Sequence, residues 1–166
     1  MLAALEAGIP INAMAEGSFG TPLCVACRNG RVKVAQLLLS HEPPANVHAL
    51  TLKTHATALH RAASANSPEL IRLLLSYQGN LSARDLSGAS VFHYAASAQA
   101  YEVICLLGRT HAYLVDEKDD LGATPLHIVS RLGNQLIIEF LSECGANINA
   151  QDEVSLVLPL SGARLT

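Results

Sequence analysis

The sequence is most informative between residues 119 and 150. This stretch opens with Asp119-Asp120-Leu121-Gly122-Ala123-Thr124-Pro125-Leu126-His127 and closes with Gly145-Ala146-Asn147-Ile148-Asn149-Ala150. Thr124 suits a helix N-cap because its hydroxyl can accept a hydrogen bond from a free backbone N–H, and Pro125 fits the first helical position. Gly133 can end that helix in a left-handed conformation, and a second apolar run then leads to Gly145. The stretch therefore predicts two short helices followed by a turn.

The same pattern recurs along the chain and indicates a repeat protein. Counterparts of the Thr124 string begin at Thr21, Thr57 and Ser90, at successive offsets of 36, 33 and 34 residues. The extra residues of the first copy fall in 40–46, whose paired prolines cannot continue a helix, so we expect a loop there. The predicted breaks between paired helices require a left-handed residue; Asn tolerates this conformation and Gln does not. These breaks fall at Gly30, Asn66, Gln99 and Gly133.

The 33-residue period, the Thr-Pro-Leu-His string, the glycine between helices and the terminal Asn-Ala together resemble an ankyrin repeat. The resemblance covers nearly the whole chain, 1–166, and implies an all-α solenoid of antiparallel helix pairs joined by β-hairpin-like turns. It divides the chain into repeats at 17–49, 50–83, 84–116 and 117–150, with partial repeats at 1–16 and 151–166. The chain departs from the family pattern at Cys24, which replaces the histidine of the string, and at Phe19 and His55, which replace turn glycines.

Composition restricts the functions that this chain can have. Half of the 166 residues are apolar and only 15% are charged, against roughly 25% charged in ordinary soluble domains, so disorder is excluded as the main state. The net charge of −3 leaves no basic excess for a phosphate backbone, and we expect no nucleic-acid partner. Apolar runs stay shorter than the roughly 18 residues of a membrane span, so we expect no membrane insertion. Four cysteines without a secretory signal predict an intracellular location, in cytoplasm or nucleus.

Candidate catalytic and metal-binding motifs are better explained by structure. The C-x-x-C of Cys24 and Cys27 lies inside a predicted helix, where we interpret both cysteines as core residues. His60, His93 and His127 hold equivalent positions in successive repeats, too far apart to share one metal ion. The resemblance implies that these histidines bond the backbone and connect neighbouring hairpins. We therefore predict a non-enzymatic protein without a cofactor.

A solenoid of this kind offers a concave face built from hairpin tips and first helices. The resemblance implies that this face binds a partner protein or peptide, through residues beside the turn glycines and at the ends of the first helices. These are Ser18, Arg28, Asn29, Lys53, Thr54, Ser64, Leu86, Ser87, Asp120, Leu121, Arg131 and Leu132. Arg28 and Lys53 make the first half basic while small residues fill the middle. We therefore expect a ligand whose acidic end lies toward the first repeat.

Several alternatives stay open on the sequence alone. The hairpin tips can be ordinary solvated surface without a ligand, or the array can be a structural spacer in a larger multidomain protein. The apolar partial repeats at both ends favour a segment of a longer array, or self-association through uncapped ends. Asn12 and Asn149 also match the asparagine that hydroxylases modify in proteins similar to this one.

Overall fold

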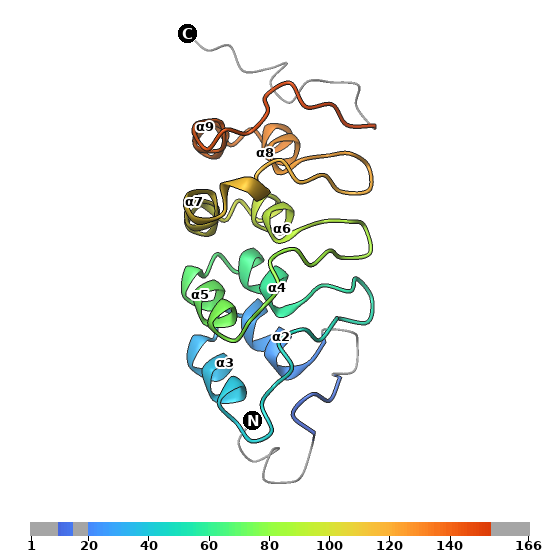
Figure 1. Ribbon diagram of the computed structural model, residues 1–166, viewed down its shortest axis with the longest axis vertical. Helices are drawn as coiled ribbons and strands as arrows, with labels where there is room; N and C mark the ends of the chain where they lie inside the picture. Colours follow the sequence, from blue (N-terminus) through green and yellow to red (C-terminus); the bar gives the residue numbers. More distant parts are fainter. Residues whose placement is uncertain (1–9, 15–19, 154–166) are drawn as a thin grey trace.

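The computed structural model describes residues 10–14 and 20–153, and this part of the chain is a stack of helix pairs without a β-strand. Figure 1 shows two columns of helices along the long axis, with a column of loops projecting from the inner one. The inner column holds the first helix of each pair: α2 (Pro22–Arg28), α4 (Ala58–Ser64), α6 (Val91–Ser97) and α8 (Pro125–Leu132). The outer column holds the second: α3 (Val32–Leu39), α5 (Pro68–Ser76), α7 (Tyr101–Thr110), with the 3-10 helix η1 (Ala112–Leu114) after it, and α9 (Gln135–Glu143). The predicted all-α solenoid is confirmed.

Each first helix begins where the repeated string predicts. The N-cap residues are Thr21, Thr57, Ser90 and Thr124. In the last three repeats the cap is reinforced by the histidine three residues later, whose Nδ1 accepts the backbone N–H of the N-cap residue at 3.1 to 3.2 Å. In the first repeat Cys24 occupies the position of this histidine. The cap there consists of the Thr21 hydroxyl, which accepts the Cys24 N–H at 3.4 Å.

The turns between paired helices all use a left-handed residue. The backbone angle φ is 65° at Gly30, 49° at Asn66, 53° at Gln99 and 71° at Gly133. The predicted break positions are therefore confirmed, including Gln99, a residue type that disfavours this conformation. The Gln99 side chain nevertheless contributes across the stack, since its Oε1 accepts a hydrogen bond from Asn134 Nδ2 at 2.9 Å.

The core lies between the two helix columns and runs continuously through the stack. Its largest fully buried side chains come from every repeat, which is how a solenoid is stabilised by neighbour-to-neighbour packing. They are Leu23, Leu38, Leu59, Leu70, Ile71, Leu74, Phe92, Ile104, Leu107, Leu126, Ile137 and Leu141. Leu37 and Leu136, which belong to the second apolar runs, are instead exposed on the outer column.

The hairpin-like turns form a ladder along the other side of the stack. Asp85 N–H donates to the carbonyl of Ala89, and Asp119 N–H does the same to Ala123. The equivalent turn 51–56 is one residue longer, and His55 takes the left-handed conformation there, with φ of 54°. Successive turns are joined by backbone hydrogen bonds of 2.9 to 3.0 Å, from the N–H groups of Leu86, Asp120 and Glu153 to the carbonyls of Thr54, Ser87 and Leu121. Phe19 lies outside the described residues, whereas 40–46 forms the expected loop.

Candidate partner-binding face

The residues predicted to contact a partner lie on the surface of the stack wherever the structure describes them. Arg28, Ser64 and Arg131 stand at or near the ends of α2, α4 and α8. Asn29 caps α2, Leu132 ends α8, and the remainder belong to the hairpin turns: Lys53, Thr54, Leu86, Ser87, Asp120 and Leu121. Thr54 is half-buried and the others are exposed. Ser18 lies outside the described residues.

A polar network connects the hairpins to the first helices in the middle of this face. Arg61 donates from Nη2 to Thr54 Oγ1 at 3.3 Å, and Thr54 Oγ1 lies 2.9 Å from Thr51 Oγ1. One repeat further, Tyr94 donates its hydroxyl to Asp85 Oδ2 at 2.9 Å. The Arg61 guanidinium also lies 6.0 Å from the centre of the Tyr94 ring, within the range of a cation–π contact. The network thus connects the turns of the second and third repeats to the first helices α4 and α6.

Arg61 and Tyr94 are not among the residues predicted from the sequence to contact a partner. Both residues directly follow the repeated histidine, a position occupied by Val25 and Ile128 in the other two repeats. The change from an aliphatic to a polar residue in the two central repeats is the signal that could have identified them.

The carboxylates at the start of the turns shape the turns themselves. Asp85 Oδ1 accepts from the backbone N–H groups of Ser87 and Ala89 and from the Ser87 hydroxyl, at 2.7 to 3.0 Å. Burial acts to raise the pKa of Asp85, but the hydrogen bonds from Ser87, Tyr94 and Ala89 outweigh it and lower that pKa. Asp119 accepts from Leu121 and Ala123 in the same way. The Asp85 and Asp119 carboxylates therefore stabilise their own turns through hydrogen bonds to the backbone.

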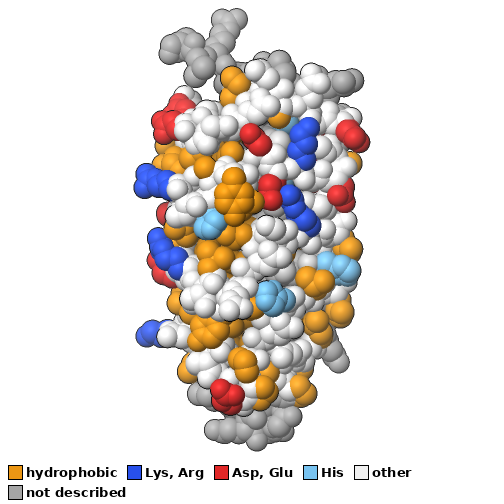
Figure 2. Space-filling view, in the orientation of Figure 1, with side chains coloured by type: hydrophobic (Ala, Val, Ile, Leu, Met, Phe, Trp, Pro, Cys, Tyr) orange, Lys and Arg blue, Asp and Glu red, His pale blue; other side chains and the backbone are white. Residues whose placement is uncertain are grey.

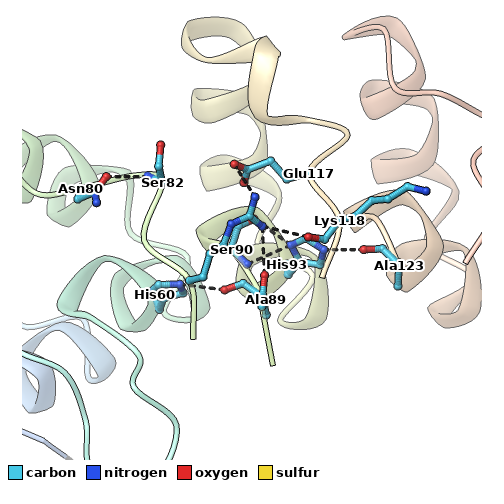
Figure 3. Close-up of polar contacts among 11 residues, drawn as sticks. His60, Asn80, Ser82, Ala89, Ser90, His93, Glu117, Lys118 and Ala123 are labelled. Atoms are coloured by element: carbon cyan, nitrogen blue, oxygen red, sulfur yellow. Dashed lines mark hydrogen bonds and ion pairs between the residues drawn. The ribbon is translucent and has the colours of Figure 1, made fainter. Parts of the chain in front are cut away.

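The repeated histidines connect each repeat to the next. His60 Nε2 lies 3.2 Å from the carbonyl oxygen of Ala89, and His93 Nε2 lies 2.8 Å from that of Ala123 (Figure 3). Because Nδ1 of each ring accepts a backbone N–H, Nε2 is the protonated nitrogen and donates to the carbonyl. The structural role predicted for these two histidines is confirmed. His127 is the last of the three, and its Nε2 is buried without a hydrogen bond of ordinary geometry to a described residue, although the backbone of Ala150 acts on the ring to raise its pKa against the larger effect of burial.

Burial makes these histidines hard to protonate. It lowers the pKa of His60 to about 4, although the Ala89 carbonyl and Asp85 act in the opposite direction. Burial also lowers the pKa of His93 and of His127. All three rings are therefore neutral at physiological pH, as their hydrogen bonds require.

The C-x-x-C motif belongs to the core, as predicted. Cys24 and Cys27 are free and buried in α2. Burial, with a smaller contribution from Cys24, raises the pKa of the Cys27 thiol to about 12. Cys27 is therefore an unreactive thiol at neutral pH, since the thiolate is the nucleophile and metal ligand. Cys24 Sγ lies 3.9 Å from the carbonyl oxygen of Ala49, which is not the equivalent of the Ala89 and Ala123 carbonyls that the histidines contact.

Charge is distributed unevenly along the stack. Residues 17–68 contain five Lys or Arg and one acidic residue, Glu42. Residues 80–153 contain four Lys or Arg and ten Asp or Glu. Two of these charged residues, Arg84 and Glu117, form a salt bridge of 2.9 Å that joins the third turn to the fourth. Residues 17–68 therefore carry a net positive charge and residues 80–153 a net negative charge, whereas the charge of the binding face itself stays a prediction.

Apolar side chains are also exposed on the hairpin turns. Leu52, Leu86 and Leu121 are 62%, 59% and 54% exposed. Figure 2 shows hydrophobic side chains gathered at the hairpin edge, on the right of the view. Exposed apolar area next to charged residues is typical of protein-interaction surfaces.

Comparison with known proteins identifies the family. The sequence matches the family model of ankyrin repeats (3 copies) at residues 2–85, 44–113 and 80–152. Inversin from Canis lupus familiaris and from Homo sapiens are each 31% identical over 140 residues, covering 81% of this chain and 13% of theirs. Neurogenic locus notch homolog protein 1 from Mus musculus is 30% identical over 145 residues, covering 81% of this chain and 6% of its own length. The chain belongs to the ankyrin-repeat family and spans a small part of these relatives.

Ankyrin repeats are, in general, non-enzymatic modules that bind other proteins. None of the helices in the described part of the chain is long and apolar enough to cross a membrane.

Proposed function

We propose that this chain binds an extended, acidic protein segment on the concave face formed by the hairpin turns and the first helices. The observation that carries the proposal is the charge distribution on that face. Lys53 and Arg28 are exposed on the first two repeats, and Glu42, in the loop that follows α3, is the single acidic residue between 17 and 68. Complementary charge speeds encounter and fixes the register of a ligand more than it adds affinity.

A structural spacer is the second candidate, because the matched region is only 13% and 6% of the length of the relatives described above. A spacer needs no ligand on its concave face. The two functions therefore differ in whether that face selects a peptide at all.

The proposal can be tested with a displayed library of random peptides of about 12 residues, enough to follow four repeats at about three extended residues each. Three proteins are compared: the wild-type chain, the double variant Arg28→Glu/Lys53→Glu, and the control Lys33→Glu/Arg72→Glu. The control reverses two exposed cations of the same repeats on the outer helices α3 and α5.

We expect the wild type and the control to enrich the same acidic peptides, with affinity for the Arg28→Glu/Lys53→Glu variant reduced about tenfold or more. Failure to enrich any peptide on the wild type contradicts the proposal and favours the spacer. Equal binding by all three proteins contradicts it as well.

A further inference from the structure

The middle of the concave face contains a hollow of about 330 Å³, lined by Ser64 of α4, Tyr94 and Ser97 of α6, and the adjacent Ala98. It exists because the ends of these two helices carry small side chains. At equivalent places α2 ends in Arg28 and Asn29, and α8 ends in Arg131 and Leu132. Because the first and fourth repeats carry larger side chains at these positions, the hollow is confined to the boundary between the second and third repeats.

Tyr94 is the aromatic residue that lines the hollow, and its side chain has contacts with several neighbours. Its hydroxyl donates to Asp85, and the Arg61 guanidinium lies near the ring. The His60 ring meets it edge-on, with 4.8 Å between the ring centres. A rigid aromatic surface between small side chains is prepared for an apolar group, because little conformational freedom is lost when that group binds.

Charge near the hollow is positive on one side. Arg61 makes one hydrogen bond from its guanidinium, to Thr54, and its Nε is buried without a partner among the described residues. Lys53 lies in the turn of the same repeat, and Arg28 ends the first helix of the preceding one. A ligand that enters the hollow therefore meets cations toward α2.

The spacing of the repeats gives the ligand a sequence pattern. Neighbouring helices in a stack lie about 8–10 Å apart, and an extended peptide advances about 3.3 Å per residue. One repeat therefore corresponds to about three peptide residues. Arg28 is in α2, one repeat away from α4 and two repeats away from α6. A ligand residue that faces Arg28 therefore lies about three to six ligand residues from the side chain that enters the hollow.

We propose that the hollow lined by Ser64, Tyr94, Ser97 and Ala98 is the anchor subsite of the concave face. It takes one aliphatic side chain of an extended peptide that carries acidic residues about three to six positions away, toward α2. This inference rests on the proposed function and adds the position of the anchor, its chemistry and its spacing from the acidic residues.

The test uses the full chain and the displayed peptides enriched on it. Ser97→Trp fills the hollow, and Ser76→Trp is the matched control, because both are exposed serines at the last position of their helices, α6 and α5. A fluorescein-labelled copy of the strongest peptide is titrated against each protein by anisotropy. A second copy of the peptide, with its aliphatic residue changed to Ser, tests the same contact without altering the protein.

We expect Ser97→Trp and the peptide substitution each to weaken binding about tenfold, with Ser76→Trp unchanged. Enriched sequences should place the aliphatic residue about three to six positions from the acidic ones. If binding depends on Arg28 and Lys53 but not on Ser97 or the aliphatic residue, the anchor is wrong and the proposed function stands. If none of these changes matters, both fail. Light scattering that shows a wild-type dimer broken by Ser97→Trp would assign the hollow to a second copy instead.

Discussion

At the scale of single residues, His60 makes the stability of the stack depend on pH. Its folded-state pKa is about 4 against 6.5 for the free side chain, so the unfolded chain takes up a proton first as pH falls. The contribution of the neutral His60 ring to the free energy of unfolding is complete above about pH 6.5 and is lost as pH falls toward 4. A shift of this size corresponds to about 3 kcal/mol at most.

We therefore expect the urea midpoint of unfolding to fall between pH 7 and pH 4.5, and His60→Ala to be destabilised at pH 7 with a flatter pH profile. The control is His41→Ala, which removes a histidine in the 40–46 loop. Parallel pH profiles for the wild type and His60→Ala would contradict this account.

Much at the residue scale could be predicted from sequence because it depends on local geometry. Thr124 as an N-cap and Gly133 as a left-handed break follow from backbone requirements of residues close in the chain. The contact of Arg61 with Tyr94 could not be predicted in this way, because it joins side chains of two repeats and depends on their orientation. The position of Ser64 on this face was predicted from the repeat register, but the hollow that it lines with Ser97 was not, because its shape depends on how two neighbouring repeats pack.

At the scale of elements, the turns between paired helices place Gln99 and Asn66 in the same backbone conformation but give them different side-chain hydrogen bonds. Both residues are left-handed, with φ of 53° and 49°. The side chain of Asn66 accepts the Val103 N–H at 3.2 Å and bonds Glu102, whereas Gln99 accepts one exposed bond from Asn134. The same conformation is thus better compensated at Asn66.

Opposite effects are expected when each of these two residues is replaced by glycine. Gln99→Gly relieves a strain of about 1 kcal/mol and should raise the free energy of unfolding by about 0.5–1 kcal/mol. Asn66→Gly loses the bonds to the next repeat and should lower it by about 1–2 kcal/mol. Urea denaturation of the two variants measures both, and changes of the same sign would show that backbone strain does not distinguish these turns.

The boundaries of the repeats themselves remain a prediction.

At the scale of the whole molecule, the stack combines a uniform fold with an uneven surface. The helix pairs repeat the same caps and breaks, while the acidic residues number one in 17–68 and ten in 80–153. The fold could be predicted because every repeat contains the same pattern of N-cap string and left-handed break. The binding face could be predicted only by position, because a ligand is recognised through the residues that differ between repeats.

The most direct test of the central claim is to map the bound peptide by amide chemical shifts in the labelled full chain. The strongest peptide enriched on the wild type is titrated into the protein. We predict that the largest shifts fall in the turns 51–56 and 85–89 and at the ends of α2, α4 and α6, including Ser64 and Ser97. Shifts confined to the outer helices α3, α5, α7 and α9 would contradict the claim that the concave face binds the partner.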